Sequence, residues 1–207
     1  MYHLILNNTI NYEVKIFNVM KAMKMINIGV LIGSFSKYSY SKKIADYLMS
    51  QTQAAKFIQI NHEILPLYNP DLENKAPLEW QVFRSVVDKM DALIFVTQEY
   101  NLSIPGGLKN AIDILSVPSP EPHIYHKPAL VITDSSGDRG GINANVHLQN
   151  VLRYIGMDVM NAFITIGKVQ EKFNDQNQLI NDQNQLIDDD TATQLNNNLL
   201  NFIKYTN

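Results

Sequence analysis

Five short apolar segments alternate along the chain with five amphipathic segments, and this alternation limits the possible folds strongly. The apolar segments cover residues 26–33, 56–60, 92–96, 129–133 and 158–166, and we expect helices at residues 41–51, 78–90, 105–115, 142–155 and 191–205. Apolar runs without polar alternation are typical of strands that are buried on both faces. The sequence therefore predicts an α/β, doubly wound, three-layer fold with a five-stranded parallel sheet between helices.

The composition fits one globular domain and argues against several classes of protein. With 207 residues, of which 45% are hydrophobic and 18% charged, the chain can form one sizeable core. A formal charge of -3 argues against nucleic-acid binding, which needs clustered basic side chains. No run approaches the roughly 18 apolar residues of a membrane helix, so we expect no membrane partner.

The chain contains no cysteine. Disulfides, thiolate nucleophiles and cysteine-ligated metals are therefore excluded, and any redox chemistry would have to be carried by a bound cofactor. A cysteine-free chain also fits a reducing compartment, and we expect a cytoplasmic protein.

Two segments stand outside the predicted core. We interpret residues 1–24 as an N-terminal extension that could be disordered, and residues 25–207 as the domain, interrupted by a polar insertion at residues 174–190. The insertion contains a tandem repeat, Asp-Gln-Asn-Gln-Leu-Ile-Asn followed by Asp-Gln-Asn-Gln-Leu-Ile-Asp. Its composition favours a solvated loop, and a short helical extension used in a subunit contact is the alternative.

Polar segments follow three of the predicted strands where each strand leads into a helix. They are residues 33–41 (GSFSKYSYS), 97–113 (TQEYNLSIPGGLKNAID) and 133–141 (TDSSGDRGG). Because parallel strands end at one edge of a sheet, we expect the three segments to converge there. Helix starts present backbone N–H groups that bind anions, so the first segment is a candidate phosphate site. N-capping by Ser39 or Ser41 explains its serines equally well, and a flexible turn explains the glycines of the third.

The first segment matches neither common glycine-rich phosphate signature. It contains no Gly-x-x-x-x-Gly-Lys-Ser/Thr and no Gly-x-Gly-x-x-Gly. This argues against ATP, GTP and a conventional dinucleotide fingerprint, and it leaves a monophosphate as the ligand. In a doubly wound sheet of order 2-1-3-4-5, the switch point lies between strands 1 and 3, where FMN binds in this type of fold.

Together these segments resemble the NADPH-dependent FMN reductase family, a flavodoxin-like group that includes azoreductases, quinone reductases and chromate reductases. The resemblance covers about residues 25–170. Its motifs are Gly33-Ser34 with Ser39, residues 65–69 (LPLYN), Glu99-Tyr100-Asn101 through residues 108–113, and residues 127–128 leading to Gly140-Gly141. It implies a homodimer with FMN as cofactor, which passes hydride from NADPH or NADH to quinone, azo or similar small-molecule electron acceptors.

The resemblance also implies which residues bind the cofactor. Ser34, Ser39 and Ser41 would hold the phosphate, Glu99, Tyr100 and Asn101 would line the isoalloxazine ring, and Ser136, Gly137 and Gly140 would border its other edge. The full predicted set is Ser34, Ser36, Ser39, Tyr40, Ser41, Gln98, Glu99, Tyr100, Asn101, Ser136, Gly137 and Gly140. The chain departs from the family at Ser36, where Arg is common, and at Gln98, where Pro is common. Lys37 or Lys42 would then have to supply the missing positive charge.

We predict no catalytic acid or base and no metal site. Hydride transfer between a nicotinamide and a flavin needs mainly groups that bind and orient, and backbone amides are the expected donors. The histidines include one close pair, His123 and His126, without carboxylate or thiolate company. A flavin-binding electron carrier or regulatory flavoprotein without nicotinamide turnover is the alternative, and a relative that binds another phosphorylated ligand is a third hypothesis.

Overall fold

The protein is described by a computed structural model that covers residues 25–118, 122–173 and 188–206. In chain order its elements are β1 (Ile26–Ile32), α2 (Tyr40–Ser50), β2 (Ala55–Gln59), η1 (Pro70–Lys75), α3 (Leu78–Asp88), β3 (Ala92–Gln98), α4 (Gly106–Leu115), β4 (Pro128–Asp134), α5 (Ile142–Tyr154), β5 (Asp158–Val159), β6 (Ile164–Ile166), η2 (Val169–Lys172) and α6 (Asp189–Thr206). The predicted extension at residues 1–24 and most of the predicted insertion, residues 174–187, lie outside the described residues.

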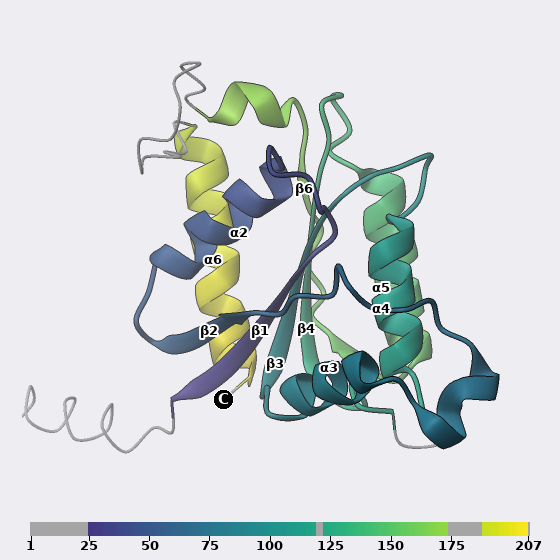
Figure 1. The fold of residues 1–207 in the computed structure, drawn as a ribbon. Helices are drawn as coiled ribbons and strands as arrows, with labels where there is room; N and C mark the ends of the chain where they lie inside the picture. Colours follow the sequence, from purple (N-terminus) through teal and green to yellow (C-terminus); the bar gives the residue numbers. More distant parts are fainter. Residues whose placement is uncertain (1–24, 119–121, 174–187, 207) are drawn as a thin grey trace, which may run out of the picture.

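The strands form one parallel sheet, and helices cover both of its faces (Figure 1). Their order is β2-β1-β3-β4-β5. The strand β6, which follows β5 in the chain, also pairs with β4, nearer the end of that strand. Helices α2 and α6 pack on one face, whereas α3, α4 and α5 pack on the other. The predicted doubly wound order is therefore confirmed. In the described ranges, no helix is both long and apolar enough to cross a membrane.

The central strands bury side chains on both faces. In β1, Ile28 and Val30 join the core beneath α2 and α6, and Leu31 joins the core on the opposite face. In β3, Leu93 and Phe95 belong to that second core, and both are fully buried. Since successive side chains of a strand point to opposite faces, a strand between two helical layers needs apolar residues at almost every position.

The fifth predicted strand, residues 158–166, is not continuous. It is divided into β5 and β6, which both run parallel to β4. Asp158 lies opposite Pro128 and Ile164 opposite Ile132, so the seven residues 158–164 lie opposite the five residues 128–132 of β4. The extra residues leave the ladder between β5 and β6, and the sheet edge is irregular there.

Two buried amides on α5 take up carbonyl groups at this irregular edge. Asn145 Nδ2 donates to the Ile164 carbonyl oxygen at 3.0 Å, and Gln149 Nε2 donates to the Ala162 carbonyl oxygen at 3.0 Å. Gln149 Nε2 also donates to Asn145 Oδ1 at 2.7 Å. These bonds satisfy backbone oxygens that a continuous β ladder would otherwise pair, and they fix β6 against α5.

Candidate functional site

Three loops leave the same edge of the sheet at adjacent strand ends. They follow β1, β3 and β4 at residues 33–39, 99–105 and 135–141, and they are called the first, second and third site loops below. Ile32 pairs with Val96 at the end of β1, and Gln98 pairs with Asp134 at the ends of β3 and β4. The three loops therefore begin side by side, as expected at the switch point of this topology.

The first site loop carries exposed hydroxyl groups. Ser34 Oγ accepts a hydrogen bond from the Ser36 N–H at 3.3 Å, and Ser36 Oγ accepts one from the Tyr38 N–H at 3.2 Å. Ser39 is buried and caps α2 by accepting from the Lys42 N–H at 3.1 Å. Acceptance leaves the hydroxyl protons of Ser34 and Ser36 available to a ligand, so the loop offers donors and contains no carboxylate.

The two lysines expected to replace the family arginine differ in their partners. Lys42 Nζ forms an ion pair with Asp46 Oδ2 at 2.9 Å one turn along α2. Lys37 is exposed, its Nζ lies 5.0 Å from the centre of the Tyr38 ring, and no ion pair with a carboxylate is found for it within the described ranges. Lys37 is thus the better candidate to neutralise an anion at this loop.

Two predicted ligands at the start of α2 face the interior of the domain. The Tyr40 ring packs 6.0 Å from the Phe173 ring, on the side of the domain that α6 covers. Ser41 is 1% exposed, and its hydroxyl contacts Asp134 Oδ2 at 2.5 Å. These contacts place both side chains behind the first site loop. The contact of Ser41 with a phosphate and the contact of Tyr40 with the cofactor stay predictions.

Phe35 connects the first site loop to the start of α4. A Cβ atom placed on Gly107 would lie 2.5 Å from a carbon of the Phe35 ring, so a side chain at residue 107 would displace this ring. The Phe35 ring also meets the His62 ring edge-on, with 5.1 Å between ring centres. Burial lowers the pKa of His62, which keeps this imidazole neutral at neutral pH.

The second site loop contains a tight turn that exposes an aromatic ring. The Tyr100 N–H donates to the Ser103 carbonyl at 2.9 Å, and the Ser103 N–H donates back to the Tyr100 carbonyl at 3.0 Å. The central residues Asn101 and Leu102 have φ angles of 50° and 62°, as in a type I′ turn. Leucine is disfavoured in this region, by about 1 kcal/mol. The turn leaves the side chains of Tyr100 and Leu102 55% and 70% exposed.

Glu99, the residue before this turn, is directed at α5. Its Oε2 accepts hydrogen bonds from the backbone N–H groups of Asn143 at 2.9 Å and Ala144 at 3.0 Å. Both N–H groups belong to the first turn of α5, where a negative charge is favourable. The carboxylate of Glu99 therefore caps a helix and fixes the second site loop, and its contact with the isoalloxazine ring stays a prediction.

The third site loop is partly open and partly packed. Ser136 and Gly137 are exposed, and the nearest atom to a Cβ placed on Gly137 is Ser135 Oγ at 4.0 Å. Gly140 has a φ of 60°, and a Cβ placed on it would lie 2.5 Å from the backbone nitrogen of Ile166. Ser136 and Gly137 thus face open space, whereas Gly140 allows the loop to pack against β6.

Asp134 lies beneath the three loops, and the sequence pattern did not predict it as a site residue. It is the last residue of β4 and 3% exposed, and burial raises the pKa of its carboxyl to about 6. Its partner Ser41 also lies 3.1 Å from Gln98 Oε1, and Gln98 Nε2 donates to the Gly33 carbonyl oxygen at 3.3 Å. The predicted ligand Gln98 therefore links strand ends beneath the loops. The available sequence signal was a single acid at the end of an apolar strand.

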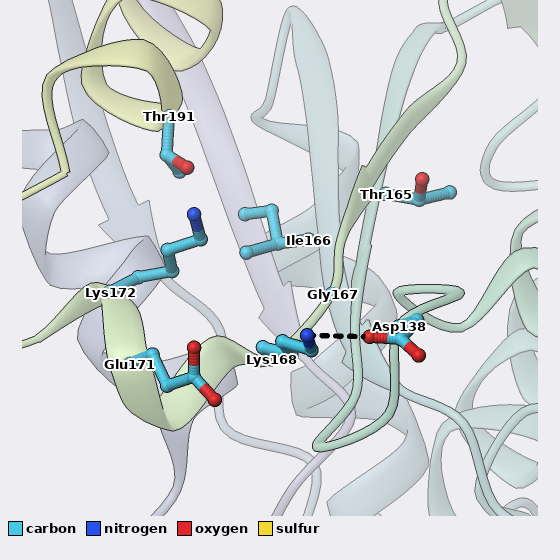
Figure 2. A pocket seen from close by; sticks show the side chains of 8 residues that line it. All are labelled: Asp138, Thr165, Ile166, Gly167, Lys168, Glu171, Lys172 and Thr191. Atoms are coloured by element: carbon cyan, nitrogen blue, oxygen red, sulfur yellow. Dashed lines mark ion pairs between the residues drawn. The ribbon is translucent and has the colours of Figure 1, made fainter.

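A separate cavity of about 240 Å³ lies on the α6 side of the third site loop (Figure 2). Lys168 Nζ pairs with Asp138 Oδ1 at 3.0 Å at its edge, and Lys172 Nζ pairs with Asp188 Oδ2 at 2.9 Å. Both cations already have carboxylate partners. The cavity is lined by Asp138, Thr165, Ile166, Gly167, Lys168, Glu171, Lys172 and Thr191, and it contains no residue of the first or second site loop.

Candidate metal ligands do not gather in the described ranges, where no group of three or more His, Asp or Glu side chains could hold a metal ion. His123 Nδ1 contacts Asp88 Oδ1 at 2.7 Å. Asp88 is the last residue of α3, and neither residue belongs to a site loop. His126 Nδ1 lies 3.8 Å from Asp158 Oδ1.

Hydroxyl-rich and aromatic loops at the switch point of a doubly wound sheet define an α/β protein that binds a nucleotide-type cofactor. Residues 26–171 match the NADPH-dependent FMN reductase family, and the chain belongs to this family. The match confirms the predicted family, its enzymatic character and FMN as its cofactor.

Curated and solved relatives agree with this assignment. The chain is 37% identical to a quinone reductase of Pseudomonas putida over 161 residues, which cover 75% of this chain and 86% of that protein. It is 33% identical to a quinone reductase of Escherichia coli over 156 residues, which cover 73% and 82%. Among solved structures, the flavoenzyme NAD(P)H:(acceptor) oxidoreductase FerB from Paracoccus denitrificans superimposes with a TM-score of 0.75 at 27% identity, covering 88% of this chain and 97% of that one.

Proposed function

We propose that this chain binds FMN between the three site loops, receives hydride from NADPH or NADH, and reduces quinones. The observation that carries the proposal is the convergence of a hydroxyl-bearing loop and an exposed aromatic turn at adjacent strand ends. Membership of the NADPH-dependent FMN reductase family supports the cofactor and the hydride donor. Relatives named quinone reductase, matched over most of their length, support a quinone as the acceptor.

The donor set of the first site loop fits the FMN phosphate. Ser34, Ser36 and Lys37 would contact it together with backbone N–H groups that precede α2, since hydroxyls, amides and a cation are the groups that bind phosphate. Ser39 would act by holding the first turn of α2 in place.

The second and third site loops fit the isoalloxazine ring. Tyr100 and Asn101 would line one side, and Ser136 and Gly137 would border the other, because these residues are exposed and Gly137 adds no side chain. Glu99, Gln98, Ser41, Tyr40 and Gly140 would support the loops rather than touch the ring, as their contacts within the domain indicate.

Bound FMN supplies the hydride chemistry, and the chain supplies binding and electrostatics. The turn at Tyr100 would orient the ring edge, and backbone N–H groups of the second and third loops would stabilise negative charge on it. We assign no side chain of the site loops as a general acid or base.

Absorbance and turnover of the purified protein test this proposal. We expect a visible flavin spectrum after FMN is added to the apoprotein, and oxidation of NADPH or NADH that depends on both FMN and a quinone. Binding of FMN without nicotinamide oxidation would instead identify an electron carrier. Absence of FMN uptake together with absence of quinone-dependent oxidation would overturn the proposal.

We also propose that the protein is a cytoplasmic homodimer. Exposed apolar side chains next to the second site loop, Leu102, Ile142 and Val146, support a subunit contact there, since Ser103 Oγ and His147 Nδ1 lie 2.7 Å apart and bring the turn onto α5. The cysteine-free sequence supports a reducing compartment, and cell fractionation tests the location.

A further inference from the structure

A chain of buried and partly buried hydrogen bonds joins α2, β3, β4 and the residue after β1 beneath the site loops. Asp134 at the end of β4 contacts the Ser41 hydroxyl in the first turn of α2, with 2.5 Å between Oδ2 and Oγ. The same hydroxyl oxygen lies 3.1 Å from Gln98 Oε1 at the end of β3. Gln98 Nε2 donates to the Gly33 carbonyl oxygen after β1 at 3.3 Å. This chain, Asp134–Ser41–Gln98–Gly33, is called the Asp134 relay below.

The number of protons in the relay depends on the state of Asp134. The Ser41 hydroxyl has one proton and faces two acceptors, Asp134 Oδ2 and Gln98 Oε1. The Gln98 amide cannot be reversed without turning its oxygen toward the Gly33 carbonyl oxygen. With an ionised Asp134, one acceptor stays without a proton. With a neutral Asp134, its O–H donates to Ser41 and Ser41 donates to Gln98, so both contacts of the Ser41 hydroxyl are hydrogen bonds.

The surroundings of Asp134 also favour its neutral form. The side-chain partner found for it in the described part of the chain is the uncharged Ser41, and burial raises the pKa of its carboxyl from 3.8 to about 6 against the opposing effect of the Ser41 hydrogen bond. The charged side chains on the surrounding elements have other contacts: Lys42 with Asp46, Lys43 with the Tyr40 and Phe173 rings, Glu99 with the first turn of α5, and Lys168 with Asp138.

We propose that Asp134 is a positioning residue that takes up a proton when FMN binds and thereby locks the first site loop to the ends of β3 and β4. The inference rests on the proposed FMN site. A phosphate bound at Ser34 and Ser36 brings negative charge close to the helix turn that Asp134 contacts through Ser41, and like charges disfavour an ionised carboxyl. Because coupling is reciprocal, the neutral carboxyl favours phosphate binding.

The direction of the pH dependence follows from this coupling. Below about pH 6 the apoprotein already holds the proton, and FMN binds without further uptake. Above about pH 6 binding must recruit a proton, so affinity falls by at most about tenfold for each pH unit while one proton is linked to binding. The phosphate of FMN itself titrates near pH 6 and also makes binding depend on pH. The contribution of Asp134 is therefore the difference in pH dependence between wild type and a variant without this carboxyl.

Calorimetric titration of the apoprotein with FMN tests the proposal, with wild type compared to Asp134→Asn between about pH 6 and about pH 8. Asparagine keeps a donor to Ser41 and cannot titrate. For wild type we expect weaker binding at higher pH and net proton uptake in buffers of different ionisation enthalpy. For Asp134→Asn we expect FMN to bind at the upper pH at least as tightly as it binds to wild type. The proton uptake that Asp134 contributes in wild type should be missing. Asp71→Asn, which removes an exposed carboxylate from η1, should behave like wild type.

The outcomes of these titrations are distinct, and one further measurement covers a variant that does not fold. Equal pH profiles and equal proton uptake for wild type and Asp134→Asn would overturn the inference while leaving the proposed function intact. If wild type binds no FMN at any pH, the proposed function fails and the inference fails with it. Should Asp134→Asn not fold, the carboxyl of Asp134 can be titrated in wild type by carbon NMR, and an Asp134 pKa that FMN leaves unchanged would overturn the inference.

Discussion

Glu99 joins two of the site loops through one carboxylate. Its oxygens accept from the first turn of α5, which follows the third site loop, and from the Asn143 side chain at 3.3 Å. The residue after it, Tyr100, begins the exposed turn. A single side chain thus sets the position of the turn relative to α5.

Replacing Glu99 with alanine should lower both stability and cofactor affinity. Loss of a cap from a helix costs about 0.5–2 kcal/mol, and we expect the free energy of unfolding to fall by about this amount in urea denaturation. FMN affinity should also decrease, because the Tyr100 turn loses its support. Glu79→Ala is the matched control, since Glu79 is exposed on the first turn of α3. A variant as stable as wild type would contradict the capping role.

At the scale of elements, the first site loop and α2 act as one unit. Ser39 caps the helix, Ser36 and Ser34 fold the loop by accepting its own N–H groups, and Phe35 anchors it on the start of α4. Ser34 and Ser36 therefore have a structural role and a proposed binding role, because a hydroxyl that accepts a backbone hydrogen bond can still donate one to a ligand.

Ser36→Asp should distinguish the structural role of Ser36 from its proposed role in binding the phosphate. Aspartate can accept the same bond from the Tyr38 N–H, so the loop should keep its shape, but it adds a negative charge where a phosphate is proposed. We expect FMN affinity to fall by about tenfold or more, while riboflavin, which lacks the phosphate, binds as before. Ser85→Asp on the exposed side of α3 should change neither affinity. An equal loss for FMN and riboflavin would contradict a phosphate contact at Ser36.

At the scale of the whole molecule, the sheet brings the site together and leaves an apolar surface beside it. Ile142 and Val146 lie one turn apart on α5, and they are 37% and 46% exposed. Leu102 is exposed on the adjoining turn. A second subunit packed on this surface would cover the side of the second site loop.

Val146→Glu should dissociate the proposed homodimer. A charge in an apolar subunit contact must be desolvated without a partner, which costs several kcal/mol. Light scattering should therefore report a dimer for wild type and a monomer for the variant, with circular dichroism unchanged. Val82→Glu on α3 serves as the control, because Val82 is exposed on the face of another helix. A dimer that persists in Val146→Glu would contradict this interface.

The amino-acid sequence alone determined the layers and the polar loops that follow β1, β3 and β4, because buried parallel strands and amphipathic helices leave clear local patterns. The strand order was expected from this type of fold rather than from a local pattern. The division of the fifth strand was not predictable, since residues 160–163 are as apolar as many strands and the amides that hold the break lie on α5. Single side-chain roles depended on partners that lie far away in the sequence. Glu99 meets a helix 44 residues later, and Ser41 meets Asp134 across 93 residues. Only the tertiary structure brings these groups together, because hydrogen bonding and burial depend on proximity in space rather than on neighbours along the chain.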